Sequence, residues 1–157
     1  MPNTPALFQH GVTGLFANEL VNNEQKILVE SILSSVGECF WVNDEKLIDA
    51  ITAISGSGPA YFFLLIQSMS QAAMALGLDE KTANSLSIKT SYGASLMASK
   101  SGKDAKILRA EVTSPNGTTQ AAIESFQDQN FEGIVASATR AAYDRARELS
   151  NELGEIE

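Results

Sequence analysis

From residue 44 to its end, this chain carries apolar residues at spacings of three and four, which is typical of helices with one buried face. The pattern is clear in residues 59–77, where Phe62, Ile66, Met69 and Ala73 follow one another at spacings of four, three and four. We find only helix signals in this part of the sequence. It therefore predicts a bundle of about six helices over residues 44–157.

The first 43 residues carry a different pattern. Short apolar runs at 12–16 and 39–42 predict two buried strands. Between them a helix is expected to begin after the cap-like pair Asn22-Asn23 and to end at Gly37, and residues 1–11 are expected to form a loop. The predicted fold class is mainly α: a helical domain at 44–157, preceded at 1–43 by a strand–helix–strand unit that suits the end of a larger α/β sheet.

The composition narrows the class of protein. Of the 157 residues, 44% are hydrophobic and only 7% are aromatic, and small alanine and serine side chains let helix axes approach closely. A net charge of −8 without a basic stripe argues against nucleic-acid binding. We expect no membrane span, because no apolar run approaches about 20 residues. These features predict an acidic cytoplasmic protein with a tightly packed helical core, shared with a second copy.

The segment T-S-P-N-G-T-T at residues 113–119 is the strongest candidate site. It places several hydroxyl groups in a loop that runs into the helix expected from Gln120. A helix N-terminus offers unpaired N–H groups and the positive end of a dipole, so it can bind a small carboxylate or phosphate. An ordinary helix cap, which needs one hydroxyl, explains the same residues and remains open.

Other motifs are weaker. The segment S-G-S-G-P-A-Y at 55–61 is explained by two helices that meet at a flexible joint, with Pro59 in a first helical turn, and it is no dinucleotide fingerprint. Glu45 and Asp49 have the spacing of an acid pair, although a solvated face explains them as well. His10 and Cys39 are read as a loop imidazole and a small buried hydrophobe, and no metal-ligand cluster is expected.

Four strings in order carry a family resemblance: M-P-N-T-P-A at 1–6, G-V-T-G at 11–14, S-G-S-G-P-A-Y at 55–61 and V-T-S-P-N-G-T-T at 112–119. With these spacings the chain resembles the pyrroline-5-carboxylate reductases through essentially all 157 residues. The resemblance implies hydride transfer from NADPH or NADH to the C=N bond of 1-pyrroline-5-carboxylate, which yields L-proline. It also implies a Rossmann domain, a helical domain that forms interlocked homodimers, and dimers that often assemble into decamers.

The resemblance also assigns site residues. It implies substrate binding by Ser114, Gly117, Thr118 and Thr119, with the carboxylate on the N–H groups of Gly117 and Thr118. The Thr119 hydroxyl would hydrogen-bond the ring nitrogen and so take the catalytic role. Asn3 and Glu45 would border the nicotinamide side as cofactor-binding residues.

The chain departs from the family pattern in two ways. Asn116 stands where the family signature has a glycine, and asparagine is the next most tolerant residue at positive φ. The first Rossmann strand and its glycine-rich turn are absent from the sequence, so most of the binding energy for the cofactor has no source. On this reading the chain is a fragment that does not reduce its substrate usefully by itself. The alternative is a helical self-association module without catalytic activity.

Overall fold

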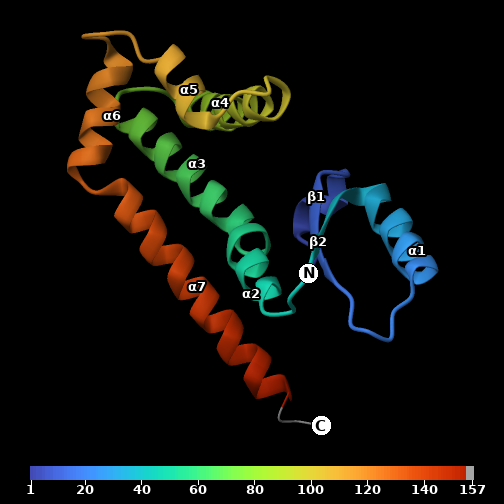
Figure 1. The fold of residues 1–157 in the computed structure, drawn as a ribbon. Coiled ribbons are helices and arrows are strands. Elements are labelled where there is room, and N and C mark those ends of the chain that lie inside the picture. The colour runs from blue at the N-terminus through green and yellow to red at the C-terminus, as the bar shows by residue number, and fades with distance from the viewer. Residues whose placement is uncertain (155–157) are drawn as a thin grey trace. The chain divides into compact units, whose positions relative to one another are not determined.

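The computed structural model describes residues 1–154 and confirms a mainly helical chain that starts with a strand–helix–strand unit (Figure 1). The strands are β1 (Gly11–Phe16) and β2 (Gly37–Val42), on either side of α1 (Asn23–Leu33). The helices that follow are α2 (Leu47–Ile51), α3 (Gly58–Ala75), α4 (Glu80–Lys100), α5 (Ala105–Glu111), α6 (Thr118–Asp128) and α7 (Phe131–Gly154).

The chain forms two compact units. The first contains Met1–Tyr61 and the chain from Val135 onward, and the second contains Phe62–Ile134. The first unit thus holds the strands, α2 and most of α7, while the second holds α4, α5 and α6. The domain boundary near Asn43 stays a prediction.

The two strands pair in parallel, from Gly11 beside Gly37 to Phe16 beside Val42. The helix between them begins as predicted, because Asn22 forms a capping box with Gln25: each side chain accepts a hydrogen bond from the other residue's N–H. Gly37 ends this segment at φ 157°, where a side chain would collide with the Gly11 carbonyl. The sheet edge therefore requires glycine at this position.

Met1 partly covers the other edge of β1. Its amino group donates to the Gly14 carbonyl at 2.8 Å, and the Gly14 N–H donates to the Met1 carbonyl at 2.9 Å. Burial lowers the pKa of this amino group. One expectation is wrong here: Thr4–Phe8, placed in a loop, forms a 3₁₀ helix, which Pro5 favours with its fixed φ.

The segment at 55–61 is also not a flexible joint. The helix continues from α2 through a π-helical turn at Thr52–Gly56 into α3, and Pro59 lies in the first turn of α3, as expected. The continuous stretch Leu47–Ala75 is long and apolar enough to cross a membrane by length and composition, with a mean hydropathy of 1.3 over its best 18 residues. This corrects the expectation that no such run exists. The core helix of a soluble protein passes the same test.

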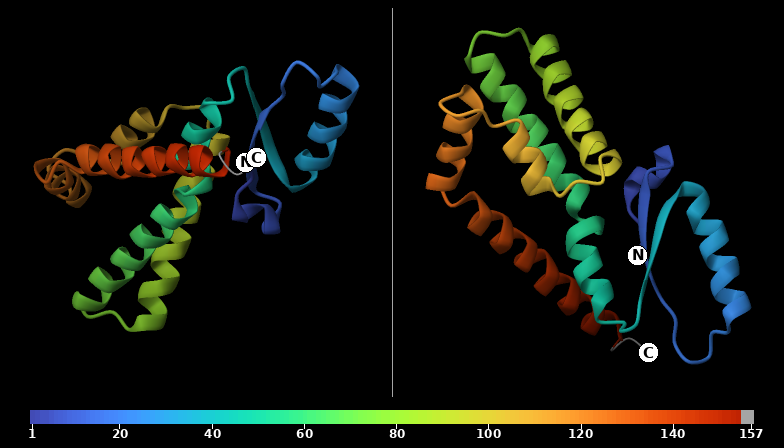
Figure 2. Two further views of the ribbon diagram at one scale, coloured as in Figure 1. Left: turned by 90° about the horizontal axis from the view of Figure 1, so that it is seen from below. Right: turned by 45° about the horizontal axis from the view of Figure 1, so that its top comes forward.

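Small side chains allow α3 and α4 to pack closely within the second unit, as the composition predicts (Figure 2). Ser70 on α3 and both Ala83 and Ser87 on α4 are almost completely buried. The Ser70 hydroxyl donates to Asn84 Oδ1 at 2.7 Å. Asp79 caps α4 by accepting from the Thr82 N–H at 3.0 Å.

Candidate functional site

The loop before α6 is shaped by two backbone features. Asn116 adopts φ 59°, in the left-handed region, which confirms that asparagine serves in place of glycine here. The next residue, Gly117, is the N-cap of α6 in an extended conformation. A Cβ at Gly117 would lie 2.6 Å from Ser114 Oγ and 3.0 Å from the Ser114 carbonyl oxygen. The turn therefore closes tightly and needs a residue without a side chain at this position.

The first amides of α6 are free to bind a ligand. The Gly117 N–H already donates to the Ser114 carbonyl at 3.1 Å, and the Gly117 carbonyl accepts from the Ala121 N–H at 3.2 Å. In the described part of the chain, no hydrogen bond outside the helix uses the N–H groups of Thr118, Thr119 or Gln120. Gly117 has no side chain to cap these N–H groups. They can therefore donate hydrogen bonds to an anion, and the positive end of the helix dipole attracts it.

Three hydroxyl groups lie on this loop and first turn. Ser114 and Thr118 are exposed and Thr119 is half-buried. The described hydrogen bonds involve none of these three hydroxyls, whereas the Thr113 hydroxyl donates to the Arg109 carbonyl at 2.6 Å and so belongs to the end of α5. Thus Ser114, Gly117, Thr118 and Thr119 share one short segment, with donors for a carboxylate and hydroxyls for a neighbouring polar atom.

Gln120 is a residue that the sequence reasoning missed. Its Oε1 accepts from the Asn116 N–H at 2.7 Å, and its Nε2 donates to Glu124 at 2.6 Å. Gln120, the third residue of the helix, thus binds the backbone of the loop with its side chain, as the third residue of a capping box does. The signal was present, since a glutamine lies three residues after the N-cap glycine.

A second candidate site lies in the first unit, at the carboxyl ends of the two parallel strands. An open cavity of about 1240 Å³ is bounded there by the end of β1, the segment 43–49 and the last turns of α7. Its charged side chains are mixed: Lys46 and Arg147 are basic, while Asp44, Glu45 and Asp49 are acidic. Ligands of open α/β sheets bind at the carboxyl ends of strands, so this is the position in which a nucleotide would be sought.

Of the two predicted cofactor residues, Glu45 lines this cavity and Asn3 does not. Glu45 is exposed, and it precedes α2 rather than lying on it. The Asn3 side chain is engaged within the protein: its Nδ2 donates to the Ser55 carbonyl at 2.9 Å and its Oδ1 accepts from the Val12 N–H at 2.8 Å. Both cofactor roles remain predictions.

The weaker motifs yield no catalytic cluster. Asp49 accepts from the Ser150 hydroxyl at 3.1 Å, so it links α2 to α7 rather than pairing with Glu45. Cys39 is a half-buried free thiol and His10 is exposed. Within residues 1–154, no group of three or more histidine, cysteine, aspartate or glutamate side chains is arranged to hold a metal ion.

Comparison with known proteins identifies the family. The model of the pyrroline-5-carboxylate reductase dimerisation family matches residues 45–149. A pyrroline-5-carboxylate reductase of Pseudomonas aeruginosa is 51% identical over 99% of this chain and 57% of its own length, and the Haemophilus influenzae enzyme is 41% identical over 95% and 55%. The chain thus spans somewhat more than half the length of these relatives.

Solved structures of pyrroline-5-carboxylate reductases are also similar to this chain. The pyrroline-5-carboxylate reductase of Coxiella burnetii superposes with a TM-score of 0.91 at 46% identity, covering 95% of this chain and 55% of that one. The Plasmodium falciparum pyrroline carboxylate reductase, solved with NADP bound, gives 0.85 at 33% identity over 94% and 60%. The helical fold and the family match define a dimerisation domain of the reductase class. The chain belongs to the pyrroline-5-carboxylate reductase family.

Proposed function

We propose that this chain carries the substrate-binding and dimerisation part of a pyrroline-5-carboxylate reductase. The reaction is transfer of a hydride from NADPH or NADH to the imine carbon of 1-pyrroline-5-carboxylate, with a proton added to the ring nitrogen, to give L-proline. The observation that carries this proposal is the start of α6, where, among the described hydrogen bonds, residues 114–120 offer free amides and unpaired hydroxyls.

Each residue of that segment has a role in the proposal. The substrate carboxylate binds the free amides of Thr118 and Thr119, and the helix dipole adds to the attraction. The Gly117 amide is held by Ser114, so Gly117 contributes mainly by leaving room for the ligand. The Thr119 hydroxyl hydrogen-bonds the ring nitrogen and orients the imine carbon, and Ser114 supplies a second hydroxyl beside the loop. Such positioning is what the protein adds to cofactor chemistry.

The described residues fit one end of a nicotinamide dinucleotide. The cavity at the strand ends has room for such a group and contains Lys46 and Arg147, and we propose that Glu45 borders the nicotinamide there. The loop between β1 and α1, residues 17–22, contains no glycine and cannot form a glycine-rich pyrophosphate cradle. When bound, NADPH or NADH supplies the hydride.

Self-association is the second part of the proposal. Apolar side chains of α3 are widely exposed in the single chain, with Phe62 at 59%, Phe63 at 65% and Leu64 at 64%. Exposed apolar surface of this kind marks a protein interface. The family model, which is that of a dimerisation domain, supports a homodimer through the helices of residues 44–157. Assembly into decamers, action in the cytoplasm, and the absence of nucleic-acid and membrane partners are proposed on the family resemblance and the acidic charge.

Replacement of the Thr119 hydroxyl tests the catalytic proposal. The assay uses a chimera in which the N-terminal part of the P. aeruginosa relative precedes this chain, and it follows NADPH oxidation with 1-pyrroline-5-carboxylate. Thr119→Val should lower kcat by roughly 10- to 100-fold with little change in the melting temperature, as expected for loss of one positioned hydrogen bond at the reacting group. Thr139→Val is the matched control, because that hydroxyl only donates to the Val135 carbonyl within α7. Unchanged turnover in Thr119→Val would remove Thr119 from the mechanism.

A further inference from the structure

The π-helical turn at Thr52–Gly56 is held by two side chains, one from the N-terminal segment and one from the first turns of α3. Its wide turn is closed by the Ser57 N–H, which donates to the Thr52 carbonyl at 2.8 Å. Single π turns are rare and often occur at functional sites. Two carbonyls of the turn accept from side chains: Ala53 from the Tyr61 hydroxyl at 3.1 Å, and Ser55 from Asn3 Nδ2 at 2.9 Å.

Asn3 connects this turn with the sheet. While its Nδ2 holds the Ser55 carbonyl, its Oδ1 accepts from the Val12 N–H at 2.8 Å. Its near neighbour Met1 exchanges two hydrogen bonds with Gly14, and a side chain at Gly56 would collide with the Met1 terminal methyl group. One partly buried amide therefore joins three segments: the N-terminal residues, β1 and the π turn.

Two of these segments, the N-terminal residues and β1, line the cavity at the strand ends, and the π turn adjoins it through α2. Met1 and Gly14 line it directly, and so do Ile48 and Asp49 on α2, the helix that runs without a break into the π turn. If the Asn3 bridge is lost, the Ser55 carbonyl and the Val12 N–H each lose their side-chain partner. The N-terminal segment is then no longer connected through this amide to the π turn that follows α2.

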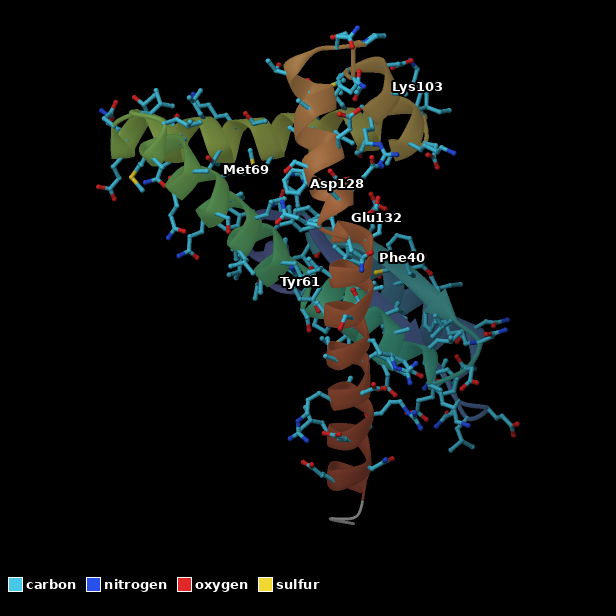
Figure 3. The ribbon with its side chains drawn as sticks, turned by 90° about the vertical axis from the view of Figure 1, so that its left-hand side faces the viewer. Phe40, Tyr61, Met69, Lys103, Asp128 and Glu132 are labelled. Atoms are coloured by element: carbon cyan, nitrogen blue, oxygen red, sulfur yellow. The ribbon has the colours of Figure 1, made fainter. Side chains whose placement is uncertain are left out.

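We propose that Asn3 is a positioning residue: by bridging Ser55 and Val12 it fixes the π turn against β1, and so holds the walls of the nicotinamide cavity in place without contacting the cofactor itself. The part of this proposal that concerns the cofactor rests on the proposed function. The bridge and its effect on the turn do not. Figure 3 labels Tyr61, whose hydroxyl makes the second attachment of the same turn, near the start of α3.

Hydrogen–deuterium exchange of the 157-residue chain without ligand tests the bridge. In Asn3→Ala, the amides of residues 53–57 and of Val12 should exchange about ten-fold faster, because each loses a hydrogen-bonded neighbour, while those of α4 stay unchanged. Asn18→Ala is the matched control, since Asn18 caps only the exposed Leu20 N–H. Unchanged exchange at residues 53–57 would overturn the proposal.

Asn3→Asp separates the two halves of the bridge and covers the case in which Asn3→Ala does not fold. The carboxylate still accepts from Val12 but cannot donate to Ser55. Protection should therefore be kept at Val12 and lost at residues 53–57. Equal protection of the turn in Asn3→Asp and the unsubstituted protein would contradict the assigned role.

Kinetics in the chimera test the link to the cofactor. Asn3→Ala should raise the KM for NADPH at least five-fold, with the KM for pyrroline-5-carboxylate and kcat within about two-fold. A raised KM for NADPH with unchanged exchange at residues 53–57 would assign Asn3 to direct cofactor contact and overturn the positioning role. If the unsubstituted chimera shows no reductase activity, the proposed function fails, whereas the exchange experiment still decides whether Asn3 holds the turn.

Discussion

Gly14 and Ile51 lie so close together that no side chain fits between them: a Cβ at Gly14 would be 2.6 Å from Ile51 Cδ1. This contact sets how closely α2 approaches β1, and hence one wall of the cavity at the strand ends. It gives a structural reason for the last glycine of the G-V-T-G string, beyond any role of that string as a family motif.

The first prediction concerns this contact. Gly14→Ala should lower the free energy of unfolding by about 1–3 kcal/mol, because an added methyl group overpacks the interface between β1 and α2. Urea denaturation followed by circular dichroism measures the change. Gly93→Ala within α4 is the control: nothing lies within 4 Å of a Cβ there, so it should stabilise the chain by up to about 1 kcal/mol through helix propensity. Equal effects of the two substitutions would contradict the contact.

The second prediction concerns the loop before α6. Asn116→Ala should destabilise the chain by about 1 kcal/mol, because alanine is strained at φ 59°, whereas Asn116→Gly should be neutral or slightly stabilising. Thermal unfolding of the two variants gives the comparison. If alanine and glycine were tolerated equally, the left-handed conformation of Asn116 would not be the one adopted in solution.

The third prediction concerns Gly117. Gly117→Ala should disrupt the closed turn, because its Cβ would meet the Ser114 hydroxyl and carbonyl oxygens. In the chimera, the KM for pyrroline-5-carboxylate should rise at least ten-fold. Adding Ser114→Ala removes the nearer of the two clashing atoms and should recover part of the lost stability. Full activity of the single variant would show that the tight turn is not needed for substrate binding.

The fourth prediction concerns self-association. Light scattering on a sizing column should give about twice the 16.8 kDa chain mass at micromolar concentration. Leu64→Asp, on the exposed face of α3, should shift the protein toward the monomer because it places a charge in the shared apolar interface. Leu20→Asp changes a leucine of the loop before α1 that is still more exposed, and it should leave the mass unaltered. A monomer in the unsubstituted chain would contradict the homodimer.

The fifth prediction concerns pH. Hydrogen bonds from Thr82 to the Asp79 carboxylate lower the pKa of Asp79 below its ordinary value near 3.8. A carboxyl group with a lowered pKa in the folded state stabilises fully above its unfolded value, and this contribution disappears as the pH falls through the folded value. Asp79→Asn keeps a capping oxygen but does not titrate, so the stability difference between it and the unsubstituted chain should narrow below pH 4. Urea titrations between pH 3 and 6 measure this, and a constant difference would argue against the cap.

Most of the secondary structure could be predicted from local sequence patterns. The helices after Asn43, the helix cap at Asn22 and the strand predicted over residues 12–16 follow from neighbours within four residues, so the sequence predicts them. The 3₁₀ helix at Thr4–Phe8 and the continuous helix through 52–56 were not predicted. The π turn depends on a contact with a distant residue, Asn3 on Ser55, whereas the 3₁₀ helix is favoured locally by the fixed φ of Pro5.

The candidate substrate segment could be predicted because its parts are contiguous: T-S-P-N-G-T-T holds the hydroxyls, the tight turn and the helix start together. The role of Asn3 could not be predicted in this way. Its partners Val12 and Ser55 are 9 and 52 residues away, and no spacing pattern reports on a hydrogen bond between them.

The amino-acid sequence by itself therefore determined the helical class, the family and the loop–helix segment, because these depend on residue type and short-range spacing. Tertiary structure alone decided which side chain from outside the helix holds the π turn and which residues surround the cavity at the strand ends. Those properties depend on where the folded chain brings distant groups together, and hydrogen-bond donors and acceptors choose partners by distance in space rather than by position along the chain.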